Sequence, residues 1–165
     1  MDGCGGSLIA PGVVLTAAHC ADEDNKFSYN GETVIVGAYD RQQATNGAQE
    51  ATVTMSVMHP AYDPEETYMD VMVLKLDSPV TTSGSVNLSL NSASSVPADG
   101  QMLTVIGTGN TAEGGTQSDQ LLQVDVPTVN TDTCNGPYEG GVFDDAMFCA
   151  GGVGGEDSCQ GAEYD

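Results

Sequence analysis

Short runs of branched aliphatic residues recur along the whole chain, and residues that favour turns separate them. The runs lie at 12–18, 33–37, 51–58, 70–76, 102–107 and 121–129. Several alternate apolar with polar residues, as do Leu122, Val124 and Val126 against Gln123 and Asp125. This period of two is typical of strands with one buried face, and Gly, Pro, Asn and Asp in the gaps are typical of turns. The pattern predicts an all-β fold of antiparallel strands, a sandwich or a barrel.

Helical patterns are confined to two short stretches, at 17–20 and 131–134. A serine-rich stretch at 86–100 is poor in large apolar residues after Leu90, which predicts a connector between two halves. A chain of 165 residues is long enough for one domain with a real core, or for two small barrels that share an interface.

The charge balance of the chain is strongly acidic. Its 24 Asp and Glu residues face only Lys26, Arg41 and Lys75, which gives a formal net charge of −21. Such a surface repels phosphate groups, so we exclude nucleic acid and anionic membranes as partners. No stretch reaches the roughly 18 apolar residues of a membrane helix. The acidic run at 22–24 is interpreted as a solvated loop, because its spacing is not distinctive of a calcium site.

The chain has five cysteines, Cys4, Cys20, Cys134, Cys149 and Cys159. Cysteines that pair indicate an oxidising compartment, and the odd number leaves one of them without a partner. We therefore expect that part of the protein is missing from the sequence.

Two motifs carry residues suited to acid–base chemistry. In "GVVLTAAHC", at 12–20, an apolar strand runs into a turn of small residues that holds His19 beside a cysteine. A histidine held there could act as a positioned general base, although a lone histidine after a strand is more often structural. In "MDVMVLKLDSPV", at 69–80, Asp70 opens an apolar strand and could equally be a charge at a strand end. His59, in the loop before it, is expected to be structural or exposed.

A third motif, "CAGGVGGEDSCQG", occupies 149–161. Taken alone, Asp157 would be an ordinary acid of a glycine-rich surface loop. Together and in this order, however, the three motifs resemble the histidine, aspartate and nucleophile-loop motifs of trypsin-like, chymotrypsin-fold serine proteases. The strand "CGGSLIAPG" at 4–12 also resembles that family, so the resemblance runs from Cys4 to Gly161.

This resemblance implies a fold and a set of residue roles. The fold would be two antiparallel six-stranded Greek-key β-barrels in one peptidase domain over 1–165, the first over 1–90 and a partial second over 101–165. His19 would be the general base and Asp70 would orient it, as in the family's triad. Asp157 would bind the Arg or Lys side chain of the substrate. The N–H of Gly161 would help to bind the oxyanion.

The resemblance stops after Gly161. The family continues with Asp, the nucleophilic Ser and two Gly, whereas this chain continues with Ala162, Glu163, Tyr164 and Asp165. Glu163 stands at the nucleophile's position, and a carboxylate cannot be activated by His19 to form the ester intermediate. We therefore expect the sequence as given to be inactive, truncated at both ends and left with an incomplete second barrel.

The same resemblance implies which cysteines pair. Cys4 would pair with Cys20 and Cys134 with Cys149, whereas the family partner of Cys159 lies further downstream. An incomplete second barrel would expose unpaired strand edges, and the isolated chain is not expected to fold stably.

The motifs support two hypotheses about function. In the first, the chain derives from an active, secreted, monomeric endopeptidase without cofactor or metal, which acts on protein or peptide substrates at Arg or Lys and meets protease inhibitors. In the second, it is a non-catalytic homologue that uses the protease scaffold as a binding or inhibitory protein.

Overall fold

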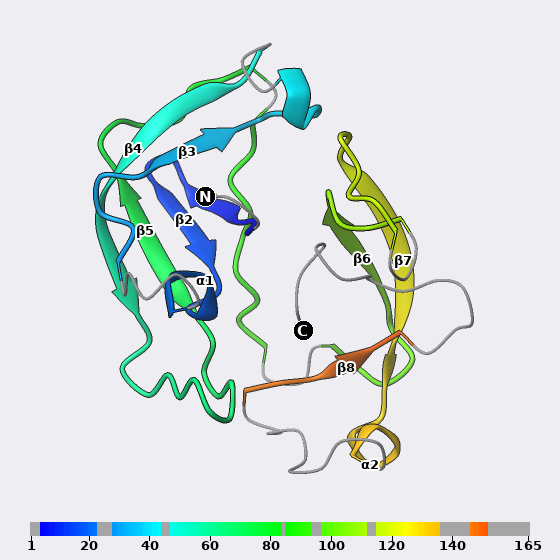
Figure 1. Cartoon of the computed structure of the whole chain (residues 1–165). Helices are drawn as coiled ribbons and strands as arrows, with labels where there is room; N and C mark the ends of the chain where they lie inside the picture. The colour runs from blue at the N-terminus through cyan, green and yellow to red at the C-terminus, as the bar shows by residue number, and fades with distance from the viewer. Residues whose placement is uncertain are drawn as a thin grey trace. The chain divides into compact units, whose positions relative to one another are not determined.

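A computed structural model describes residues 4–22, 28–43, 47–83, 85–93, 97–111, 115–135 and 146–151. The chain divides into two compact units, Met1–Leu90 and Asn91–Asp165 (Figure 1). Within the described residues the helical segments are short: α1 (His19–Asp22), the 3₁₀ turn η1 (Arg41–Gln43) and α2 (Thr131–Cys134). None of the helices in this described part is long and apolar enough to cross a membrane.

The first unit is built on one curled antiparallel sheet (Figure 1). Its strands are β1 (Ser7–Ala10), β2 (Val13–Thr16), β3 (Thr33–Val36), β4 (Gln49–Met58) and β5 (Met72–Leu76). Their spatial order is β1-β2-β5-β4-β3, and each neighbouring pair is antiparallel. Because β3, β4 and β5 are consecutive neighbours and β5 also returns to lie beside β2, the sheet has Greek-key order. The all-β, antiparallel prediction is confirmed.

The core of the first unit lies on one face of this sheet. Along β5 the residues alternate, with Met72, Leu74 and Leu76 buried while Lys75 is exposed. Val53 on β4 packs into the same cluster. Full burial of one such side chain stabilises a fold by about 1.5–3 kcal/mol. Turning a strand over would expose its whole apolar set, so the period of two determines which face of the strand points inward.

The second unit contains a smaller sheet with strand order β6-β7-β8. The strand β6 (Met102–Gly107) pairs along its whole length with residues 122–127 of β7 (Leu122–Val129), and β8 (Cys149–Ala150) pairs with the last two residues of β7. After β7 comes α2, whose first turn is capped by the side chain of Asn130, which accepts the N–H of Asp132 at 2.9 Å. The disulfide Cys134–Cys149 joins α2 to β8, the pairing that the family resemblance implies.

Candidate active site

His19 lies at the end of a well-anchored turn. Strand β2 ends at Thr16, whose hydroxyl donates to the carbonyl of Gly5 at 2.7 Å. Ala18 then packs fully buried in the core. Helix α1 begins at His19, two residues after the start of the helical stretch that the sequence predicts.

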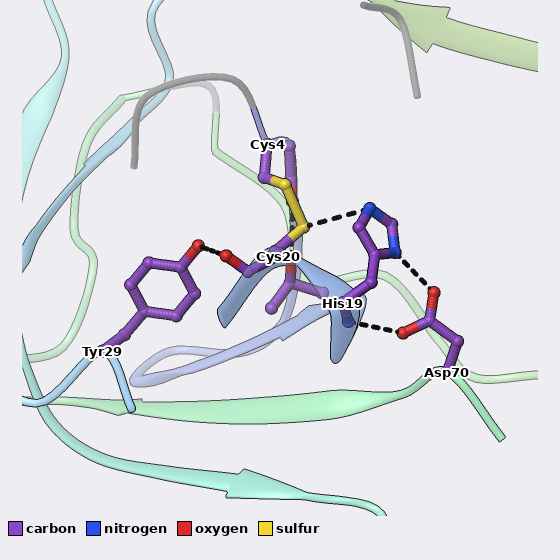
Figure 2. A network of polar contacts seen from close by, with 7 residues as sticks. Cys4, His19, Cys20, Tyr29 and Asp70 are labelled. Carbon is purple, nitrogen blue, oxygen red and sulfur yellow. Dashed lines mark hydrogen bonds and ion pairs between the residues drawn. A yellow bond between two sulfur atoms is a disulfide. The ribbon is translucent and has the colours of Figure 1, made fainter. Parts of the chain in front are cut away.

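Two further contacts hold the residue that follows His19. Cys20 forms a disulfide with Cys4, as the resemblance implies. The carbonyl of Cys20 also accepts a hydrogen bond from the hydroxyl of Tyr29, which is buried (Figure 2). The sequence did not single out Tyr29, because nothing in the pattern "FSYNGE" separates an anchoring tyrosine from an exposed one.

Strand register brings Asp70 to His19. In the antiparallel pair of β2 and β5, Thr16 lies opposite Met72. His19 follows Thr16 by three residues and Asp70 precedes Met72 by two, so both leave the sheet at the same end. Side chains 51 positions apart in the sequence therefore come into contact.

Asp70 forms two hydrogen bonds with His19, one to its ring and one to its backbone (Figure 2). Oδ2 of Asp70 lies 2.6 Å from Nδ1 of His19, and Oδ1 accepts the backbone N–H of His19 at 2.7 Å. The two side chains are only 13% and 10% exposed, so water competes weakly for these bonds. Because an ionised carboxylate only accepts hydrogen bonds, Nδ1 carries the proton, and Nε2 is the basic nitrogen of the neutral ring.

The backbone around Asp70 adopts an unusual conformation. Met69 has a φ of 53°, a backbone conformation that residues other than Gly, Asn and Asp seldom adopt. The N–H of Val71 bonds back to the carbonyl of Met69 at 2.7 Å, which closes a tight turn centred on Asp70. Residues held in this region cost about 1–3 kcal/mol and concentrate where a side chain must be aimed.

Nε2 of His19 faces the disulfide. It lies 3.8 Å from Sγ of Cys20 (Figure 2). Because Nε2 carries no proton in this tautomer and a disulfide sulfur has none to donate, this is a van der Waals contact and not a hydrogen bond.

The remaining predicted residues fall into two groups. His59 is exposed, as expected, and its Nδ1 accepts the N–H of Ala61 at 3.2 Å within its own loop. Asp157, Cys159, Gly161 and Glu163 lie outside the described residues, so the predicted specificity pocket and oxyanion donor stay predictions.

A histidine whose ring an aspartate orients is the geometry of hydrolases with a Ser-His-Asp triad, and the β-barrel class of these hydrolases carries it on antiparallel sheets. Comparison with known proteins identifies the family within that class. The family model described as Trypsin matches residues 1–162, and the chain belongs to the trypsin family. The resemblance stated from the motifs is thereby confirmed, and with it the trypsin-like fold class.

Several curated trypsins are similar to the chain over nearly its whole length. It is 36% identical over 166 residues to Trypsin zeta of Drosophila erecta, covering 96% of this chain and 57% of that protein. It is 34% identical over 159 residues to a Trypsin of Squalus acanthias, covering 96% of this chain and 66% of the relative. With a Trypsin of Saccharopolyspora erythraea the identity is 37% over 162 residues, again covering 96% and 66%. The chain thus spans 57–66% of the length of these relatives.

Proposed function

We propose that this chain represents a trypsin-like serine endopeptidase, which hydrolyses peptide bonds of protein or peptide substrates after Arg or Lys. The observation that carries the proposal is the pair of hydrogen bonds that Asp70 makes with Nδ1 and with the backbone N–H of His19. An ion pair on the surface would be exposed to water and would not need a second hydrogen bond to the backbone. A general base does need it, because both its tautomer and its direction must be set before reaction.

Each residue has one task in the proposed mechanism. Nε2 of His19 takes the proton of the nucleophilic hydroxyl and later returns it to the leaving amine. Asp70 keeps the proton on Nδ1 and stabilises the imidazolium that forms. The N–H of Gly161 donates to the developing oxyanion, and Asp157 pairs with the cationic side chain of the substrate. General base catalysis of this kind contributes about 10²–10⁴-fold to the rate.

The sequence as given is proposed to be inactive, because Glu163 occupies the place of the nucleophile. A carboxylate cannot form the serine ester on which this route depends. The proposal therefore includes the expectation that the transcript encodes Asp-Ser-Gly-Gly after Gly161. Mass analysis of the protein from its source, with sequencing of its terminal peptides, tests that expectation directly.

A chimaera tests the catalytic roles themselves. Residues 4–161 would be grafted between the terminal segments of Trypsin zeta of Drosophila erecta, so that the relative supplies the segment after Gly161. Fluorogenic peptide amides that differ only in Arg, Lys or Gln before the scissile bond are the substrates. We expect cleavage after Arg and Lys only, and loss of this preference in Asp157→Asn.

The controls separate catalysis from folding. His19→Ala should lower kcat by several orders of magnitude, and Asp70→Asn by about 10⁴-fold, which is the effect of the corresponding change in this family. His59→Ala should leave kcat unchanged. A folded chimaera without activity, or one whose activity survives His19→Ala, would refute the assignment.

A second candidate function is favoured by the literal sequence, which has Ala162 and Glu163 where the family has Asp and Ser. The chain would then be a non-catalytic homologue that binds a substrate, an inhibitor or another protein. A natural product that carries Glu163 and binds a trypsin inhibitor without hydrolysing peptides would favour this function over the first.

The remaining expectations belong to the same proposal. We propose a secreted, monomeric protein whose first barrel spans 1–90 and whose second begins near 101, open to protease inhibitors. The net charge of −21 supports the expectation that it binds neither nucleic acid nor anionic membranes. The same acidity would favour cationic substrates and inhibitors through long-range attraction.

A further inference from the structure

The corner around His19 places two sulfur atoms that the proposed mechanism leaves unused beside the proposed general base. Sγ of Cys4, Sγ of Cys20 and a ring nitrogen of His19 all lie within 4.8 Å of one another. Sulfur and imidazole are the donors that zinc prefers, but sulfurs joined in a disulfide are not thiolates and cannot serve as such ligands. The redox state of one bond therefore decides whether this corner offers a ligand set.

We propose that opening the Cys4–Cys20 disulfide converts this corner into a site for a thiophilic divalent cation, with Zn²⁺ held by both thiolates and by Nε2 of His19. In the reduction, a dithiol gives two electrons and two protons to the S–S bond and is itself oxidised to a disulfide. Zn²⁺ then displaces the two thiol protons. Three protein ligands leave a fourth position for water.

The geometry suits such a site. In a tetrahedral zinc centre a nitrogen and a sulfur ligand lie about 3.5 Å apart, given Zn–N near 2.0 Å and Zn–S near 2.3 Å. Nε2 of His19 already lies 3.8 Å from Sγ of Cys20. The two sulfurs must separate after reduction, and Cys4 is the partly exposed member of the pair.

The outer contacts of the site are also in place. Histidine ligands of zinc usually donate their other ring N–H to a carboxylate, which fixes the tautomer and strengthens the ligand. Asp70 makes that contact with Nδ1 at 2.6 Å (Figure 2). The carbonyl of Cys20 is held by Tyr29, and Ala18 and Ala21 are buried in the core, so the turn has anchors other than the disulfide.

The proposed site and the proposed catalysis would compete for the same atom. Metal binding occupies Nε2 of His19, the nitrogen that would accept the proton of the nucleophile. A reduced, zinc-loaded protein would therefore be blocked as a peptidase. That consequence rests on the proposed function, whereas metal binding itself does not.

Metal titration of the full chain tests the inference. Cys134, Cys149 and Cys159 are first replaced by Ser, so that Cys4 and Cys20 are the remaining thiols. The protein is reduced with a phosphine, desalted without oxygen and titrated with Co²⁺, whose thiolate charge-transfer bands report sulfur ligation. Zn²⁺ is then added to displace the Co²⁺.

We expect one equivalent of Co²⁺ to bind the reduced chain and none to bind the oxidised chain. His19→Ala should weaken binding more than tenfold and Asp70→Asn about tenfold or more, as loss of an outer contact does. His59→Ala is the matched control and should leave the affinity unchanged. Circular dichroism follows the fold on reduction.

Three results would overturn the inference: no Co²⁺ bound by the reduced chain, equal affinity in His19→Ala, or loss of β structure on reduction before metal is added. None of these depends on peptide hydrolysis, so a failure of the proposed function would be seen separately in the chimaera.

Discussion

Replacement of Asp70 by Ala tests whether its two hydrogen bonds to His19 stabilise the fold. The change removes the acceptor of two hydrogen bonds, at 2.6 and 2.7 Å, from a place where the His19 side chain is only 13% exposed. Each donor left without its partner costs about 1–3 kcal/mol, so we expect the free energy of unfolding to fall by about 2–6 kcal/mol. Urea unfolding of the chimaera described above, with its disulfides intact, measures the change.

A second aspartate supplies the matched control. Asp77 also accepts a backbone N–H, that of Thr52 at 3.1 Å, but its side chain is exposed to water. Water replaces that acceptor once it is lost, so Asp77→Ala should destabilise the chain far less than Asp70→Ala. The loss of stability in Asp70→Asn should lie between those of the two alanine variants, because the amide oxygen still accepts one hydrogen bond. Equal losses in the two alanine variants would refute the reasoning.

Three further predictions concern the core, the titration of one carboxylate and the turn before Asp70. Leu74 is 0% exposed and Leu90 is 61% exposed, so Leu74→Ala should cost about 2–5 kcal/mol in urea unfolding and Leu90→Ala almost nothing; similar losses would contradict the assigned core. The N–H of Thr52 lowers the pKa of Asp77, so its contribution to stability is present above the unfolded pKa of about 3.9 and is lost as pH falls through the lower folded pKa. The stability difference between the native chain and Asp77→Asn should accordingly shrink from about pH 6 to pH 3, and a constant difference would contradict this. Because Met69 has a φ of 53°, Met69→Val should lower the unfolding midpoint more than Met69→Gly, and the reverse order would contradict strain at this residue.

Most strands could be predicted from the sequence because their burial follows a period of two. The run at 102–107 coincides with β6, and the run at 121–129 contains β7. Strand β8 has only two residues, too few for any period to be visible, and the edge of β7 rather than its own sequence defines it. β1 was identified only through the family resemblance, since four residues show no clear alternation.

The two residues of the candidate site could be predicted from the sequence, but the contacts that hold them in place could not. His19 and Asp70 stand in motifs specific enough to be identified by resemblance. The bond from Tyr29 to Cys20 and the left-handed backbone at Met69 have no such signal, because each depends on what the fold places opposite a side chain. The helical turn begins at His19 and not at Ala17, a difference of two residues at a helix end.

The core and the candidate site are encoded by the same register. Pairing of Thr16 with Met72 places Met72 and Leu74 in the core and, two residues before Met72, Asp70 beside His19. A slip of one residue between β2 and β5 would turn Leu74 outward and Lys75 inward, at a cost of several kcal/mol. The same slip would move Asp70 by about 3.3 Å along its strand, beyond the reach of either hydrogen bond to His19. Selection for a buried core on these two strands therefore also maintains the contact on which the proposed catalysis depends.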